Sequence, residues 1–158
     1  MGGTVDAICI TSTKHGRQRR VTQVKIVAGA GIEGDRYFGA RQRYPGQNVT
    51  LVEIEAIERF NQENGTSIAI DGTRRNIVTR GIRLDALVGK EFTIGDVRLR
   101  GVELCEPCSI LGKKNLASET LNAAQIVKKF VHKAGLRADA LSGGVIKVGD
   151  AVTEIANR

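Results

Sequence analysis

Short segments in which apolar and polar residues alternate recur along the whole chain, and this pattern predicts β-strands with one buried face. Residues 23–27 show it clearly, because Val24 and Ile26 fall on one face and Lys25 on the other. We expect further strands, or residues leading into one, at 4–10, 47–49, 68–70, 74–79, 138–141, 145–148 and 151–155. Strands this short and numerous favour a fold built mainly from β-sheet.

The clearest pair of strands is a hairpin over residues 91–104. The arms are 91–94 and 97–104, and Gly95-Asp96 between them is a typical turn pair. In the second arm Val97 and Leu99 fall on one face and Arg98 on the other. The sequence therefore predicts an arm with one buried and one exposed face, which ends just before Cys105.

Residues 51–64 have the apolar period of a helix rather than of a strand. Thr50 and Glu53 have the spacing of a capping box, in which each side chain bonds to the backbone of the other residue. Gly65 follows as a natural C-terminal stop. We therefore expect the helix to begin at residue 51 and to end at residue 64.

A second helix is predicted over residues 117–134, where apolar side chains again follow the helical period. Two helices are too few for a doubly wound parallel sheet, which needs one between most of its strands. The pattern predicts a mainly β fold, a β-barrel with two or more inserted helices. A chain of 158 residues without repeats or linkers fits one domain, residues 1–158.

The charge balance narrows the class of ligand. With 24 basic and 17 acidic residues, the protein has a formal net charge of +7. A basic surface attracts anions, among them nucleic acid, anionic lipid and phosphorylated small molecules. The densest basic run is only Arg17-Gln-Arg-Arg20, and aromatic residues for base stacking are scarce. This composition argues against a nucleic-acid-binding module, while the charge alone does not decide between anionic lipid and a phosphorylated small molecule.

The sequence shows no feature of a membrane or secreted protein, which indicates its cellular compartment. No apolar stretch approaches the roughly 20 residues of a membrane span, and the N-terminus does not resemble a secretory signal. Three cysteines, an odd count, do not make a disulfide framework. We expect a soluble, cytoplasmic protein with reduced thiols and no membrane partner.

The pair Cys105-Glu-Pro-Cys108 is the strongest chemical signal. A zinc site would need two further ligands, but a second cysteine pair is absent, and His15 and His132 are far apart in the sequence. Thiol–disulfide exchange also uses a C-x-x-C motif, which normally opens a helix in a βαβ unit. Here the motif follows a hairpin arm instead.

Two interpretations of the pair remain. Free cysteines often fill space in a core, as we expect for Cys9 at the end of an apolar strand. The alternative is one reactive thiolate at Cys108, which could attack sulfur or bind a soft metal with help from Lys113 and Lys114. The residues favour this alternative, because Glu and Pro between the cysteines are unusual in a packed core.

Two polar motifs could hold an anion. In Arg74-Arg75-Asn76, the arginines could grip a phosphate in two parallel hydrogen bonds and the asparagine could pair with the edge of a heterocycle. Solvated charge on an edge strand explains the same residues without a ligand. Gly34-Asp35 is a typical turn pair and is followed by the basic residue Arg36, but the segment lacks the pattern of a nucleotide P-loop.

Taken together, these motifs resemble the MOSC family, which is named after the C-terminal domain of molybdenum cofactor sulfurases. The resemblance covers nearly the whole chain, and the matching segments occur in the order of the family. They are Gly31-Ile-Glu-Gly-Asp-Arg36, Gln47-Asn-Val-Thr-Leu51, Arg74-Arg-Asn-Ile-Val78, Leu87-Val-Gly-Lys90, Ile94-Gly-Asp96, Cys105-Glu-Pro-Cys108 and Val148-Gly-Asp150.

The resemblance implies a barrel of the pyruvate-kinase β-barrel type and a site for molybdenum-molybdopterin. It makes Cys108 the molybdenum ligand and the catalytic residue, and it makes Arg74 and Asn76 ligands of the pterin and its phosphate. In the sulfurase setting, the domain binds the cofactor or carries sulfur as a persulfide. Relatives of the amidoxime-reducing type instead reduce N-hydroxylated compounds at the molybdenum.

Three departures bear on these roles. Tyr37 stands where many members have histidine. We expect the protein to lack the additional N-terminal domain of the amidoxime-reducing relatives. We also expect no desulfurase domain, so the expected partners are a separate pyridoxal-phosphate cysteine desulfurase or a molybdoenzyme that accepts the product.

The sequence thus predicts one site in which the Cys108 thiolate lies beside a cradle for a phosphorylated pterin. The cradle is assigned to the cations and polar residues Lys25, Asp35, Arg36, Arg74, Arg75 and Asn76. A thiolate suits both a soft metal and a persulfide, so residue chemistry leaves cofactor binding and sulfur carriage open together.

Overall fold

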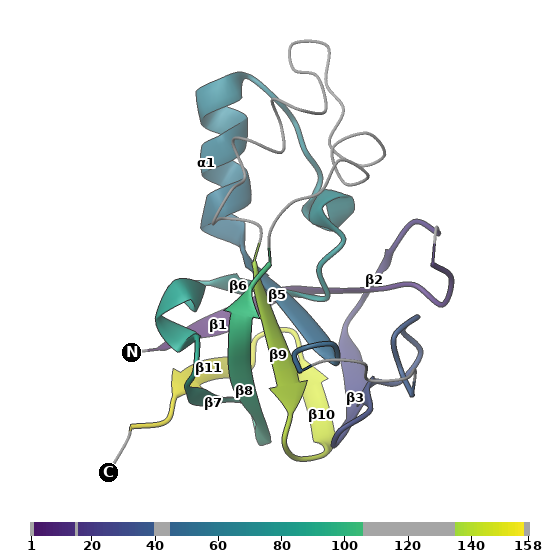
Figure 1. The fold of residues 1–158 in the computed structure, drawn as a ribbon. Helices are drawn as coiled ribbons and strands as arrows, with labels where there is room; N and C mark the ends of the chain where they lie inside the picture. The colour runs from purple at the N-terminus through teal and green to yellow at the C-terminus, as the bar shows by residue number, and fades with distance from the viewer. Residues whose placement is uncertain (1, 15, 40–44, 106–134, 157–158) are drawn as a thin grey trace.

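The computed structural model describes residues 2–14, 16–39, 45–105 and 135–156. Seven strands form its main sheet: β1 (Gly2–Ile10), β5 (Val49–Glu53), β6 (Ile77–Arg80), β7 (Glu91–Ile94), β8 (Val97–Leu104), β9 (Leu136–Ala140) and β11 (Ala151–Glu154). They pair in the order β11-β7-β8-β9-β5-β6-β1, and β1 pairs again with β11. The sheet therefore closes on itself as the predicted β-barrel (Figure 1).

Neighbouring barrel strands are antiparallel except β5 and β6, which run parallel. The predicted hairpin over residues 91–104 is confirmed as β7 and β8, with Glu91 opposite Arg100 and Ile94 opposite Val97. A short strand, β2 (Arg19–Val21), pairs with the end of β1 and extends beyond the ring. The end of β1 and β2 thus form a two-stranded extension of the barrel.

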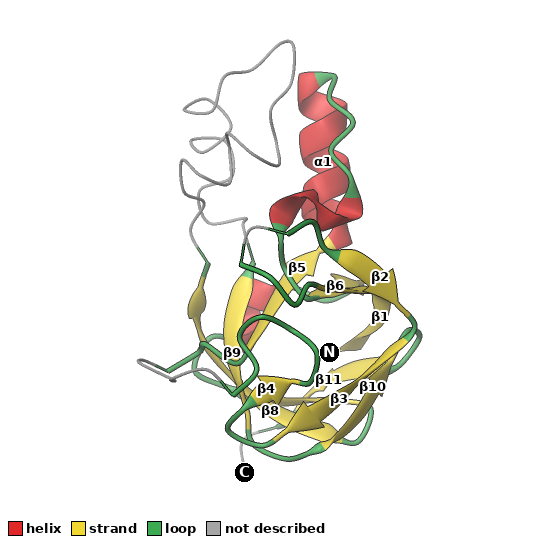
Figure 2. Ribbon diagram, turned by 90° about the vertical axis from the view of Figure 1, so that its right-hand side faces the viewer, coloured by secondary structure: helices red, strands yellow, loops and turns green. Residues whose placement is uncertain are grey.

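A second, three-stranded sheet lies against one side of the barrel (Figure 2). Its strands are β3 (Gln23–Val27), β4 (Gly31–Ile32) and β10 (Gly144–Lys147), in the order β10-β3-β4. The strand predicted over residues 23–27 is confirmed: Val24 and Ile26 are buried and Lys25 is exposed. The apolar face of this sheet contributes Ile26 and Ile146 to the core.

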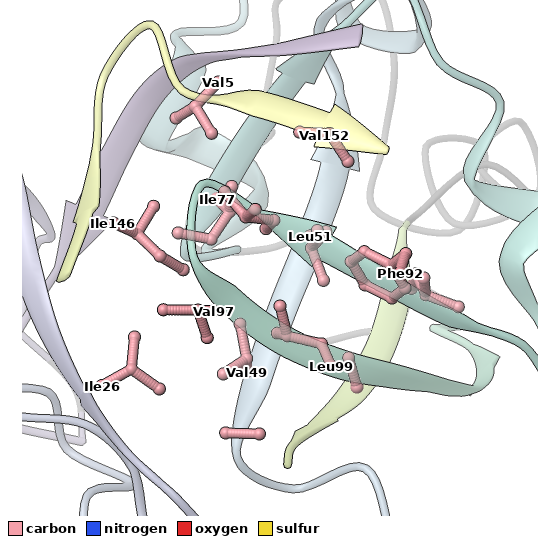
Figure 3. Close-up of a cluster of buried hydrophobic side chains, with 14 of the residues drawn as sticks. Val5, Ile26, Val49, Leu51, Ile77, Phe92, Val97, Leu99, Ile146 and Val152 are labelled. Atoms are coloured by element: carbon pink, nitrogen blue, oxygen red, sulfur yellow. The ribbon is translucent and has the colours of Figure 1, made fainter. Parts of the chain in front are cut away.

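The core is aliphatic, with Phe92 as its largest fully buried side chain. Residues on the inner faces of the strands fill the barrel, which follows from the alternation in the sequence. Figure 3 shows them converging: Val5, Ile26, Val49, Leu51, Ile77, Phe92, Val97, Leu99, Ile146 and Val152. Each such side chain contributes about 1.5–3 kcal/mol through burial.

The helix α1 (Ile54–Asn64) begins three residues later than the sequence predicted. Leu51 and Val52 are both fully buried, because α1 covers the outer face of β5 and β6. A strand buried on both faces loses its alternation, so these residues mimicked the first turn of a helix. Gly65 ends the helix in the left-handed conformation (φ 62°), as predicted.

The predicted capping box is wrong. The N-cap residue is Glu53, and it makes no side-chain cap hydrogen bond. Thr50 lies within β5, and its hydroxyl donates a hydrogen bond to the Asn76 side chain over 3.1 Å. Thr50 therefore joins β5 to the residue before β6 and does not cap the helix.

The strand predicted at residues 68–70 is also wrong. Asn61 of α1 bonds to both the amide and the carbonyl of Ile68, at 2.9 and 3.1 Å, which supplies the partners that a neighbouring strand would give. Ile70 then begins the 3₁₀ helix η1 (Ile70–Thr73), and η2 (Leu84–Leu87) follows β6.

The second helix, predicted over residues 117–134, lies outside the described residues. Among the residues that are described, no helix has the length and apolar character to cross a membrane.

Candidate functional site

Buried polar side chains gather where β1 ends and β6 begins. Residues 34–36, 73–76 and 9–18 contribute to this group, although they are distant in sequence. Its buried members are Thr11, Gln18, Asp35, Thr73 and Asn76. Buried polar groups are costly unless they are bonded, and in the described residues Gln18 Oε1 and Thr73 Oγ1 have no hydrogen-bond partner.

Asp35 fixes the turn that carries Arg36. Its side chain is 1% exposed, and its carboxylate accepts hydrogen bonds from the amides of Thr11 and Tyr37, at 3.3 and 3.4 Å. The Arg36 amide donates to the Thr11 carbonyl over 2.7 Å. Asp35 therefore acts as a local anchor that ties this turn to the end of β1.

The Arg36 guanidinium is buried and only partly bonded. Its Nη2 donates to the Arg74 carbonyl at 3.4 Å, and the group stacks on the Tyr37 ring, 4.6 Å from the centroid. Nη1 lies 3.5 Å from an Asp35 oxygen but has no hydrogen-bond acceptor within the described part of the chain. A buried donor without an acceptor is suited to an anion.

Arg74 holds a loop. Its backbone is left-handed (φ 59°), the only such non-glycine residue described, and its amide closes η1 on Asp71. Its guanidinium donates to the carbonyls of Gly16 and Lys14, at 2.7 and 2.9 Å. Burial, and then the positive charge of Arg36, lower the pKa of Arg74. Two of its donors are thus committed to the loop after β1.

Asn76 joins three strands. Its carboxamide donates to the Cys9 carbonyl at 3.2 Å, and it accepts hydrogen bonds from the Thr50 amide and hydroxyl at 3.2 and 3.1 Å. Cys9, Asn76 and Thr50 belong to β1, the start of β6, and β5. The side chain predicted to pair with a heterocycle is therefore bonded within the barrel.

Arg75 lies on the other side of this segment, near the end of β8. Its charge, together with that of Arg137, lowers the pKa of the Cys105 thiol, but burial is the larger effect and the pKa is raised overall. Arg137 also hydrogen-bonds to that thiol. Arg74 and Arg75 thus lie in different surroundings, and Cys105 is a buried thiol with a raised pKa.

Arg137 was missed by sequence reasoning. It stands on β9 opposite Glu103 of β8, and the two charged groups lie 3.9 Å apart. Oppositely charged residues that face each other across two strands stabilise the pairing of those strands. The Glu103–Arg137 pair could be recognised only once the pairing of β8 with β9 was known.

Lys25 projects from the small sheet into solvent, with 67% of its side chain exposed. Its charge partner is Glu33 at 3.9 Å, and none of its described contacts reaches Arg36 or Arg74. Cys9 is fully buried as expected, and burial raises its pKa to about 11. Lys25 is therefore a solvent-exposed cation, and Cys9 is a buried thiol whose pKa is raised.

Cys108, Lys113 and Lys114 lie outside the described residues, so the position of the predicted thiolate relative to these groups stays a prediction. No cluster of three or more histidine, cysteine or acidic side chains that could hold a metal ion occurs in residues 2–14, 16–39, 45–105 and 135–156.

Comparison with family models decides the classification. The model described as "MOSC domain" matches residues 33–153, which include the turn at Asp35, the Arg74–Asn76 segment and both cysteines of the C-x-x-C pair. The chain belongs to the MOSC family. The resemblance predicted from the short motifs is thereby confirmed.

Solved structures agree on the MOSC fold. The YuaD protein of Bacillus subtilis superimposes with a TM-score of 0.85 at 18% identity, covering 100% of this chain and 98% of YuaD. YiiM from Geobacillus stearothermophilus gives 0.75 at 14% identity, covering 98% and 75% of the two chains. YiiM from Escherichia coli gives 0.70 at 17%, covering 100% and 71%. No curated protein matches the chain in sequence.

Proposed function

We propose that this MOSC protein binds a molybdopterin-type cofactor through the Arg36 guanidinium and carries sulfane sulfur as a persulfide on Cys108. The supporting observation is the Arg36 Nη1 donor, which is buried and has no acceptor in the described structure. A cofactor phosphate would complete it, because a charged hydrogen bond to phosphate offsets the cost of leaving that donor unbonded.

The other cradle residues divide by role. Asp35 and Tyr37 orient Arg36, while Arg74 and Asn76 shape the segment behind it through bonds to backbone groups. These four act as positioning residues for the Arg36 donor. Lys25, which projects from the small sheet, contributes only long-range positive charge.

Cys108 is proposed as the working thiol because Cys9 and Cys105 are unsuited to the task. Both are fully buried, and burial raises the pKa of each thiol. A protonated thiol is a poor nucleophile and a poor metal ligand. When bound, the cofactor would supply a metal centre that takes a thiolate ligand and changes oxidation state.

The sulfur step needs a thiolate and a persulfide donor. The Cys108 thiolate attacks the outer sulfur of the donor's persulfide, the donor's S–S bond breaks and its cysteine leaves as a thiolate. A new S–S bond forms on Cys108, the donor returns to the thiolate level as Cys108 reaches the persulfide level, and no external oxidant or reductant is needed. The donor class is a pyridoxal-phosphate cysteine desulfurase acting on free cysteine.

Arg36→Gln should lower the molybdenum and phosphorus that co-purify with the protein by about tenfold or more, since a charged hydrogen bond is worth about 1.5–3 kcal/mol. Elemental analysis of protein made in a molybdopterin-producing host measures this. Arg59→Gln, at an exposed position on α1, is the matched control. Equal metal content in the two variants, with unchanged melting temperatures, would contradict the assignment of Arg36.

A further inference from the structure

Positive charge is concentrated in one part of the chain. Residues 7–32 contain Lys14, Arg17, Arg19, Arg20 and Lys25 and no acidic residue, so five bases give this segment +5 of the protein's +7. It comprises the end of β1, the loop after it, β2, β3 and β4. We call this the basic ribbon.

Three cations of the basic ribbon have no carboxylate partner. Arg17 pairs with Asp71 at 3.1 Å. Lys14, Arg19 and Arg20 are exposed, and none is paired within the described structure. Elsewhere most described cations are paired, as in Arg80 with Asp6 and Glu58, Arg83 with Asp85, and Arg98 and Arg100 with Glu91. Among the described residues outside the ribbon, Arg59, Arg74 and Lys147 likewise form no ion pair with a carboxylate.

Hydrogen bonds to the backbone hold the segments that carry these charges. In the ladder of β1 and β2, Arg19 lies opposite Ile10 and Arg20 lies opposite Cys9. The loop that carries Lys14 is held by two hydrogen bonds from Arg74. Because these hydrogen bonds hold the backbone of the ribbon, binding a partner would cost little backbone conformational entropy.

The neighbouring sheet adds apolar surface. β2 leads directly into β3, whose Lys25 lies opposite Val145 of β10. Val145 and Val148 are 41% and 45% exposed, and Lys147 lies between them in the sequence. Exposed valines beside unpaired cations make a mixed surface, with an apolar part and a charged border.

This composition fits a protein better than a nucleic acid or a membrane. Residues 7–32 contain no phenylalanine, tyrosine or tryptophan on which bases could stack. They form strands and turns rather than the amphipathic helix that typically lies on a lipid surface. Solvent-exposed cations next to a small apolar patch match the rim and centre of a protein interface.

We propose that the basic ribbon, with Val145 and Val148 beside it, is the docking surface for the acidic face of the protein that delivers sulfur to Cys108. The inference rests on the proposed function for the identity of the partner. Arg74 links the two regions, because it bonds to the ribbon loop while its own carbonyl accepts from Arg36. A protein docked on the ribbon would therefore lie next to the candidate site.

The test compares Lys14→Glu/Arg19→Glu/Arg20→Glu with wild type. The probe is a pyridoxal-phosphate cysteine desulfurase from the same organism, and the dissociation constant is measured at low and at physiological salt. Arg59→Glu/Arg83→Glu/Arg98→Glu is the control, since it changes net charge equally at exposed positions outside the ribbon. We expect the ribbon variant to bind about tenfold or more weakly than both other proteins, and wild-type binding to weaken with salt.

Two further measurements distinguish a wrong choice of partner from a failure of the proposed function. Duplex DNA and phosphatidylglycerol vesicles should bind wild type more weakly than the desulfurase does, and tighter binding of either would overturn the choice of partner. Loading of Cys108 by inorganic polysulfide should be equal in all three proteins, because a small donor needs no docking surface. Equal desulfurase affinity in both variants, or no complex with wild type, refutes the ribbon proposal, whereas failure of polysulfide to load Cys108 refutes only the proposed function.

Discussion

Gly135→Ala should destabilise the protein by about 3 kcal/mol or more. Gly135 has φ +120°, a conformation that L-residues rarely adopt. A Cβ there would lie 2.0 Å from the Leu51 carbonyl oxygen of β5. The Gly135 carbonyl accepts the Cys105 amide at 2.7 Å, so β5 cannot relieve the overlap without disturbing the junction of β8 and β9.

Chemical denaturation and melting temperature measure this effect. At about 2–4 °C per kcal/mol for a protein of this size, we expect a loss of roughly 10 °C. Gly29→Ala is the matched control, because Gly29 also has a positive φ (+72°) but nothing lies within 4 Å of its Cβ position. If both variants lose the same small amount, the close approach at Gly135 does not limit the fold.

Asn76→Leu should cost about 3 kcal/mol, because it removes the carboxamide that joins three strands. The Thr50 amide and hydroxyl lose their acceptor in the barrel wall, and among the described residues the Cys9 carbonyl keeps only the bond from Gln18 at 3.4 Å. A buried polar group left unbonded costs about 1–3 kcal/mol. Thr50→Val is the matched comparison, since it removes only the hydroxyl and should cost less.

The same variant distinguishes a positioning role from a ligand role. We expect the unfolding free energy to fall, and cofactor content to fall only as far as the folded fraction does. A variant as stable as wild type that has lost its cofactor would show instead that the Asn76 carboxamide contacts the ligand directly.

Sequence reasoning succeeded where one local pattern decided the structure. The β7–β8 hairpin has alternating residues and its own turn, and β3 has a strict alternation, so each could be predicted alone. Gly65 at the end of α1 followed from the left-handed backbone that a helix stop requires. These features depend on neighbours in sequence.

It failed where distant segments decided the structure. The start of α1 was misplaced because the helix itself buries the outer face of β5, which hides the alternation of Leu51 and Val52. The β-barrel itself was predicted, but not which strands close it, because the pairing of β1 with β11 joins the two ends of the chain and no local pattern encodes it.

The candidate site shows the same division. The family resemblance placed Arg36, Arg74 and Asn76 in one cradle, but their roles depend on contacts with residues 9–18 and with Thr50. Arg74 was predicted as a phosphate clamp, yet its guanidinium donates to the loop carbonyls of Gly16 and Lys14. The unbonded Arg36 donor could be seen only in the folded structure.

The most direct test of the account is the mass of Cys108 after sulfur transfer. The variant Cys9→Ala/Cys105→Ala, which keeps Cys108 as its only cysteine, is incubated with a cysteine desulfurase and free cysteine. We expect a gain of about 32 Da, one sulfur atom, that maps to the Cys108 peptide, is removed by reductant and is absent from Cys108→Ser. Wild-type protein that gains sulfur on Cys105, or a Cys108-only variant that gains none, would contradict the account.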